Sequence, residues 1–119
     1  MFVSISNHPL SDWQKNQIDA ALELGGGEIR EIPFPSPSGE ATTEEVVAAA
    51  DRVAAMVPDG AVAMVHGENV TAYAIAKRLR ARGLRVVVPR HPRREPLEER
   101  NGKTVVAKEF VFTGWLDYE

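Results

Sequence analysis

The chain has 119 residues, which is the size of one domain, because natural domains cluster around ~100–150 residues. Hydrophobic residues make up 44% of the chain and charged residues 26%, a balance that excludes a disordered chain, a collagen and a coiled-coil rod. The absence of cysteine excludes disulfides, a thiolate nucleophile and cysteine-ligated metal, and it favours a cytoplasmic location. We therefore expect a single domain over residues 1–119.

The charge of the chain is unevenly distributed. Residues 1–76 carry 3 basic and 11 acidic side chains, whereas residues 77–119 carry 11 basic and 6 acidic ones. A basic region on an acidic protein suits a small polyanion without general affinity for duplex nucleic acid, although a solvated basic helix face is the equal alternative. No apolar run approaches the ~18 residues that cross a bilayer, so we expect a soluble protein with no membrane partner.

Strand and helix patterns alternate along the first half of the chain. Phe2 to Ser6 is a short apolar run typical of a strand. Ser11 and Gln14 have the spacing of a capping box, which predicts a helix that ends at the glycines of residues 25–27. Residues 28–34 predict a second strand near a sheet edge, since prolines lie within it and after it.

The same alternation continues to residue 88. Thr42 and Glu45 repeat the capping-box spacing before a second helix. Ala61 to Val65 is a continuous apolar run, as expected of a central strand that is covered on both faces. Asn69 is a candidate cap for a third helix, and Leu84 to Val88 predicts the next buried strand.

This order predicts an α/β fold of Rossmann-like type. Parallel strands joined by right-handed crossovers form a central sheet with helices on both faces. Beyond Pro89 the pattern changes, because Asn101-Gly102 is a preferred hairpin turn between the strand-like residues 96–100 and 103–112. A C-terminal β-hairpin is therefore expected to complete the domain.

Ligands of open parallel sheets bind outside the carboxyl ends of the strands. All three histidines follow predicted strands, and each alone is more typical of an ordinary loop residue, but their shared edge favours a site. The candidate ligand contacts at these ends are Ser6, Asn7, His8, His66, Gly67, Glu68, Asn69, Arg90, His91, Arg93 and Arg94. Because no two of these residues have a metal-ligand spacing such as HExxH, we expect neither a metal nor a cofactor.

Two of these loops favour an anionic ligand. Gly67 lets a ligand approach the backbone, and the helix behind it presents free amide donors, although a plain tight turn explains this glycine equally well. Arg90, Arg93 and Arg94 surround His91, and guanidinium groups match phosphate oxygens. The alternative is that these arginines pair with the glutamates of residues 95–99 at the surface. The loops contain neither a Walker A motif nor a dinucleotide fingerprint.

Three segments together resemble a known group of proteins: the opening SISNHPLSDWQ, the central VAMVHGENVTAYAIAKRLRARGLRVVVP and the ending NGKTVVAKEFVFTGWLDY. Over almost its full length the chain resembles the small stand-alone proteins of type III CRISPR systems, which are similar to the CRISPR-associated Rossmann-fold (CARF) sensor domains. The resemblance implies a CARF-like homodimer that holds a cyclic oligoadenylate at the carboxyl ends of its strands.

The resemblance also implies a ring nuclease, which cuts cyclic tetra-adenylate by metal-independent attack of a ribose 2'-hydroxyl. In that reaction His8 would serve proton transfer or leaving-group stabilisation, and Arg90 and Arg93 would contact phosphates. Asn7 and the Gly67 amide would contact ligand oxygens, and Glu68 a ribose hydroxyl or the adenine amine. The alternatives are a protein that sequesters the ring without cutting it, or an unrelated nucleotide-binding or protein-binding module.

Overall fold

The fold is built on a five-stranded sheet with the strand order β2-β1-β3-β4-β9 in the computed structural model. The structure describes residues 1–36, 38–90, 93–94, 97–100, 103–106, 109–110 and 112–119. The parallel strands are β1 (Phe2–Ile5), β2 (Ile29–Ile32), β3 (Val62–Val65) and β4 (Arg85–Arg90), and β9 (Gly114–Asp117) runs antiparallel to β4. The predicted α/β class and the edge position of β2 are confirmed.

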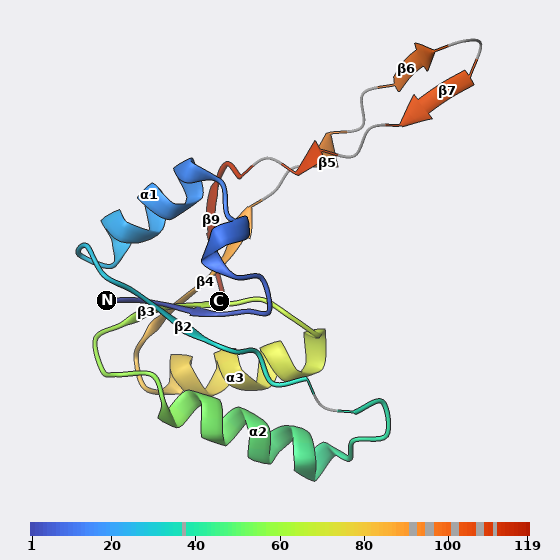
Figure 1. The fold of residues 1–119 in the computed structure, drawn as a ribbon. Coiled ribbons are helices and arrows are strands. Elements are labelled where there is room, and N and C mark those ends of the chain that lie inside the picture. Colours follow the sequence, from blue (N-terminus) through green and yellow to red (C-terminus); the bar gives the residue numbers. More distant parts are fainter. Residues whose placement is uncertain (37, 91–92, 95–96, 101–102, 107–108, 111) are drawn as a thin grey trace.

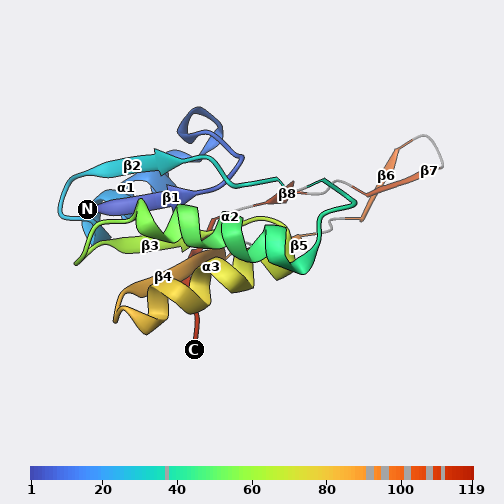
Figure 2. The ribbon, with the colours of Figure 1, turned by 90° about the horizontal axis from the view of Figure 1, so that it is seen from below.

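Three helices cover the two faces of this sheet. They are α1 (Lys15–Leu24), α2 (Thr43–Ala55) and α3 (Asn69–Ala81). Figures 1 and 2 show α1 on one face and the pair of α2 and α3 on the other, so the predicted placement of helices on both faces is confirmed. No helix among the described residues is long and apolar enough to cross a membrane.

The alternation of side chains along β1 divides the core into two layers. Val3 and Ile5 are fully buried on the side of α2 and α3, where they join a cluster that includes Ile75 and Leu79. Phe2 is fully buried in the other layer with residues such as Met64, Val87 and Ala21 of α1. Because β1 is buried on both faces, its sequence does not alternate between apolar and exposed polar residues, and even Ser4 is buried.

Aromatic rings fill the layer beneath α1. The ring centroid of Phe2 lies 6.3 Å from that of Trp13 and 5.1 Å from that of Trp115, and Phe112 lies 4.8 Å from Trp115. The rings come from the start, the first loop and the end of the chain. The cluster therefore joins β9 and the loop before α1 to the centre of the sheet.

The helix starts differ from prediction at two of three positions. Thr42 caps α2 as expected, since its hydroxyl accepts a hydrogen bond of 3.2 Å from the backbone N–H of Glu45. The capping box at Ser11 is wrong, because Leu10–Asp12 forms a short 3-10 turn, Trp13 is extended, and α1 begins only at Lys15. Asn69 is the first residue of α3 and not its cap, a role that Glu68 performs.

The predicted hairpin forms, but the chain does not end with it. β6 (Leu97–Arg100) and β7 (Lys103–Val106) pair antiparallel with Arg100 opposite Lys103. The turn residues Asn101 and Gly102 lie outside the described residues. A second pair, β5 (Arg93–Arg94) with β8 (Glu109–Phe110), precedes and follows this hairpin, and Figure 1 shows β6 and β7 away from the sheet.

After the hairpin the chain returns to the sheet as β9, which the sequence analysis missed. Gly114 to Asp117 pairs with the end of β4, and Trp115 lies opposite Pro89. Asp117 accepts hydrogen bonds of 2.6 and 3.2 Å from the guanidinium of Arg85, so β9 is bound to β4 by side chains as well as by its backbone.

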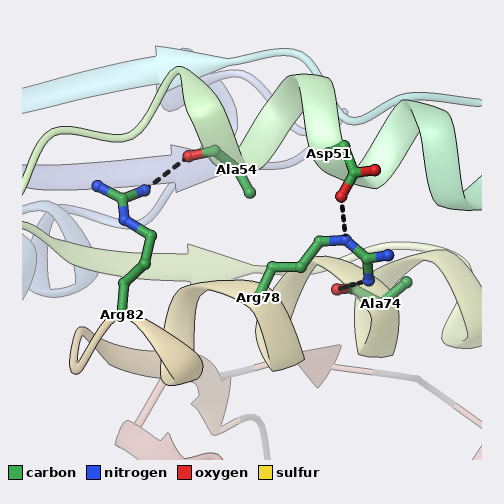
Figure 3. A network of polar contacts seen from close by, with 5 residues as sticks. All are labelled: Asp51, Ala54, Ala74, Arg78 and Arg82. Atoms are coloured by element: carbon green, nitrogen blue, oxygen red, sulfur yellow. Dashed lines mark hydrogen bonds and ion pairs between the residues drawn. The ribbon is translucent and has the colours of Figure 1, made fainter.

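An arginine at the end of α3 clamps the end of α2. Arg82 donates hydrogen bonds of 2.8 Å to the carbonyl oxygens of Ala54 and Val57, and Figure 3 shows the first of these. Ala54 is in the last turn of α2 and Val57 follows its C-cap, so the guanidinium supplies charged donors to two carbonyls at the point where the helix ends. The Ala54 carbonyl also accepts from the backbone N–H of Val57 at 3.2 Å. Further along α3, Arg78 reaches Asp51 on α2 and the carbonyl of Ala74 (Figure 3).

We expect the Arg82 clamp to contribute measurably to stability. Arg82→Ala should lower the free energy of unfolding by about 1–3 kcal/mol, because the carbonyls of Ala54 and Val57 lose charged donors. Lys77→Ala, at an exposed position of the same helix, should change it by no more than ~0.5 kcal/mol. Urea denaturation measures both, and equal effects of the two substitutions would contradict the clamp.

Candidate functional site

Parallel pairing brings the loops after β1 and β3 together. Ile5 lies opposite Val65 in the register of these strands, and the backbone N–H of His66 donates to the carbonyl of Ile5 at 3.0 Å. The segments that leave the two strands therefore start side by side at the carboxyl edge of the sheet, where ligands of such sheets bind.

The structure brings two of the three histidines into contact. The imidazole rings of His8 and His66 are stacked, with centroids 5.9 Å apart and planes inclined by 30°. Both residues are exposed. The third histidine, His91, lies outside the described residues. His8 and His66 thus form a histidine pair at the surface. The strand pattern predicts that both lie at one edge of the sheet, but it does not predict that their rings stack.

Local hydrogen bonds fix the loop that carries His8. The backbone N–H of His8 donates to Ser6 Oγ at 3.0 Å, and Trp13 Nε1 donates to the His8 carbonyl at 3.3 Å. Asn7 Nδ2 donates to Ser36 Oγ at 3.1 Å, in the segment that follows β2. Ser6 and Asn7, both predicted to contact a ligand, therefore also hold the loop in place.

A cleft of about 480 Å³ lies beside the histidine pair, between α1 and the carboxyl edge. This volume is within the ~300–1,000 Å³ typical of small-molecule sites. Its lining includes His8, His66, Asp12, Trp13, Gln17, Met64 and Pro89. We call it the α1 cleft. Trp13 and Gln17 were not predicted as site residues, although Gln17 is a polar side chain on the face of α1 that also buries Ala21.

A second cleft of about 410 Å³ lies on the α3 side of the same edge. His66 and Pro89 line both clefts, and the second is also lined by Tyr73, Tyr118 and Asn69. Burial raises the pKa of Tyr118 above its ordinary value. The edge is therefore hollowed on both sides of the position where β3 ends.

Packing explains the glycine at position 67. A Cβ atom built there would lie only 2.4 Å from the ring of Phe34, which is 4% exposed. Essentially no real Cβ atom approaches another atom so closely, so a larger residue requires Phe34 to move. Packing against this aromatic ring is enough to explain the glycine, and the predicted contact of the Gly67 amide with a ligand stays a prediction.

The N-terminus of α3 holds a carboxylate from the protein itself. Glu68 accepts hydrogen bonds from the backbone N–H groups of Val70 at 2.8 Å and Thr71 at 2.9 Å, and from the Thr71 hydroxyl at 2.7 Å. These bonds, the Thr71 backbone bond foremost, lower the pKa of Glu68. The anion that we expected at this helix terminus is therefore the Glu68 side chain, and the Val70 and Thr71 amides are not offered to a ligand phosphate.

The predicted basic loop starts at the same edge. Arg90 is the exposed last residue of β4, and its carbonyl accepts from the backbone N–H of Thr113 at 2.9 Å. Arg93 and Arg94 form β5, whose side chains lie outside the described part of the chain, as does His91. The predicted contacts of these three side chains to phosphate stay predictions.

A family model matches residues 1–115, which include both histidines of the pair, the α1 cleft and β4. The chain belongs to the uncharacterized protein MJ1673 family. Comparisons with curated proteins and with solved structures give no match.

The side chains that the structure describes in this MJ1673-family protein do not gather into a group of three or more potential metal ligands. The chemistry that these residues can offer at the edge is proton transfer by imidazole, charge from Arg90 and hydrogen bonding by the residues of the α1 cleft.

Gly67→Ala tests the packing against Phe34. We expect it to lower the free energy of unfolding by about 1–3 kcal/mol, as overpacked sites do. Gly39→Ala is the matched control, since a Cβ there meets nothing within 4 Å. Denaturation of Gly67→Ala, Phe34→Leu and the double variant should show that the two effects are less than additive, and strict additivity would contradict this explanation.

Glu68→Ala tests the helix cap through its pH dependence. Because the folded-state pKa of Glu68 is lowered, its stabilisation is complete above the ordinary glutamate pKa of ~4.3 and is lost as the pH falls through the lower folded value. The variant should therefore melt below the wild-type protein at pH 7, and the difference in Tm should shrink below pH ~4. A difference that does not depend on pH, as expected for Glu23→Ala at an exposed position of α1, would contradict the cap.

Proposed function

We propose that this protein binds a cyclic oligoadenylate, cyclic tetra-adenylate in the first instance, and cuts it as a metal-independent ring nuclease that ends type III CRISPR signalling. The observation that carries the chemistry is the pair of stacked histidines beside the α1 cleft. The identity of the ligand rests on the resemblance of the sequence to the CARF group. With this function the protein would act in the cytoplasm.

Two imidazoles are suited to the two proton transfers of this reaction. A ribose 2'-oxygen attacks the adjacent phosphorus, the bond from phosphorus to the 5'-oxygen breaks, and the products are a 2',3'-cyclic phosphate and a 5'-hydroxyl. One proton must leave the 2'-hydroxyl and one must reach the 5'-oxygen. Imidazole has a pKa near neutrality, so one member of the pair can act as base and the other as acid.

In this mechanism His8 protonates the leaving oxygen and His66 accepts the proton of the 2'-hydroxyl. The ring centroids are 5.9 Å apart, so a phosphodiester group held between the exposed edges of the rings has an imidazole near each reacting oxygen. Arg90 stands on the same edge and supplies positive charge for the phosphate, with Arg93 as the predicted second contact. Asn7 positions the loop of His8 through Ser36.

The size of the cleft favours two copies of the chain for one ring. A cleft of about 480 Å³ suits a single nucleotide better than a ring of four. A ring with two-fold symmetry can place two of its nucleotides in the clefts of two subunits that are related by the same axis. We therefore propose a homodimer as the active form.

Sequestration of the ring without cleavage is the second candidate. It is favoured because Gly67 packs against Phe34 and because Glu68 is already bonded to backbone amides at the start of α3. Gly67 and Glu68 are then less available to hold a ligand in position for reaction. The α1 cleft is still open and can bind the ring. This candidate predicts tight binding of cyclic tetra-adenylate and no products.

Product analysis with His8→Ala tests the proposal. The wild-type protein, mixed with first equal and then excess cyclic tetra-adenylate, should yield linear products with cyclic phosphate ends. His8→Ala should slow cleavage by about 10²–10⁴-fold, which is the usual contribution of a general acid or base, while it still binds the ring.

Ser11→Ala is the control, because this exposed residue does not line the α1 cleft and should leave the rate unchanged. Turnover that survives His8→Ala would contradict the role of His8. Binding without any products in the wild-type protein would support sequestration, and absence of binding would contradict both candidates.

A further inference from the structure

The α1 cleft is lined by a largely buried polar side chain that bonds to none of the described residues. Gln17 lies in the first turn of α1, is 6% exposed and lines the cleft. Its side-chain amide makes no hydrogen bond to any residue that the structure describes. Its neighbours Gln14 and Asn16 differ from it in this respect, since their side chains bond to the backbone of Phe112 at 3.0 Å.

The amide atoms of Gln17 are not among the fully buried polar atoms without a partner, so they reach the solvent of the cleft that this residue lines. The adjoining layer is apolar, with Met64 1% exposed and Ala21 fully buried, and a leucine would fit such surroundings without an unpaired group. The exposure that Gln17 retains is toward the cleft that it lines. The amide can therefore bond to a molecule that replaces water in that cleft.

We propose that Gln17 recognises an adenine base in the α1 cleft. A glutamine amide presents one donor and one acceptor side by side, and the N6 amino group and N7 of adenine present the complementary pair. The same edge of guanine offers two acceptors, O6 and N7, which one amide cannot satisfy. This inference rests on the proposed function in that it supplies the base specificity of the same site.

The aromatic wall of the cleft suits the same ligand. Trp13 lines it, and its indole is fixed by the hydrogen bond to the His8 carbonyl and by its contacts with Phe2 and Trp115. Bases stack on such rings without regard to sequence, so Trp13 supplies affinity and Gln17 supplies the choice of base.

The base site is continuous with the histidine pair. His8 and His66 line the same cleft as Gln17 and Trp13. A nucleotide whose base lies against Gln17 can therefore extend its ribose and phosphate toward the two imidazoles. The loop of His8 is attached to Trp13, so base binding and the position of the catalytic imidazole are linked through one hydrogen bond.

The test compares adenosine and guanosine 5'-monophosphate as probes, with affinities measured by NMR titration. The wild-type protein should bind the adenine nucleotide at least ~10-fold more tightly, as bidentate base recognition usually allows. Gln17→Leu should abolish this preference. Gln17→Glu, which can accept but not donate to N7, should also lose the adenine nucleotide, and Glu23→Gln on the exposed face of α1 should change nothing.

A measurement of folding accompanies the titration. Because Gln17→Leu places an apolar side chain in an apolar layer and breaks no hydrogen bond to a described residue, its Tm should stay close to that of the wild-type protein. Loss of adenine preference in this folded variant would support the inference. Equal binding of the two nucleotides by the wild-type protein, binding of neither, or a preference that survives Gln17→Leu would overturn it.

Cyclic tetra-adenylate separates this inference from the proposed function. If Gln17→Leu binds and cuts the ring as the wild-type protein does, the inference fails and the proposed function stands. If the wild-type protein neither binds nor cuts the ring but shows a preference for the adenine nucleotide that depends on Gln17, the base site stands and the proposed function fails.

Discussion

The parallel pairing of β1 with β3 is the constraint on which the site depends. Ile5 lies opposite Val65, and the His66 backbone extends the ladder by one hydrogen bond of 3.0 Å to Ile5. A slip of one residue would turn every side chain of β1 to the other face of the sheet. Phe2 would then leave the aromatic rings of one layer, and Val3 and Ile5 the largely aliphatic cluster of the other, so the different packing of the two faces favours this register. The loops that carry His8 and His66 then leave the sheet side by side, although 57 positions separate the two histidines in the sequence.

Local patterns in the sequence were sufficient for most of the fold. The apolar runs of β1, β3 and β4 and the cap at Thr42 are short-range signals, and the structure confirms each of them. The start of α1 was not predictable in this way, because Trp13 takes an extended conformation and packs against rings that come from both ends of the chain. β9 was missed for the same reason, since its pairing with β4 spans the whole hairpin.

The sequence was sufficient to predict the edge of the sheet at which the candidate site lies, but not the contacts within that site. The strand order placed His8 and His66 together because the carboxyl ends of parallel strands meet. The roles of Gly67 and Glu68 depend instead on Phe34 and on the amides of α3, and these contacts are visible only in three dimensions. Gln17 was missed because a glutamine on a helix is ordinary in sequence and unusual only once it is 6% exposed and without a partner among the described residues.

A single spectrum tests most directly whether the carboxyl edge and the α1 cleft form one nucleotide site. Uniformly ¹⁵N-labelled protein, which has two tryptophans, is titrated with cyclic tetra-adenylate and its indole, amide and imidazole resonances are followed. The account predicts that the largest shifts fall on the Trp13 indole, the Gln17 side-chain amide and the imidazoles of His8 and His66. Shifts confined to the outer surfaces of α2 and α3, or none at saturating ligand, would contradict it.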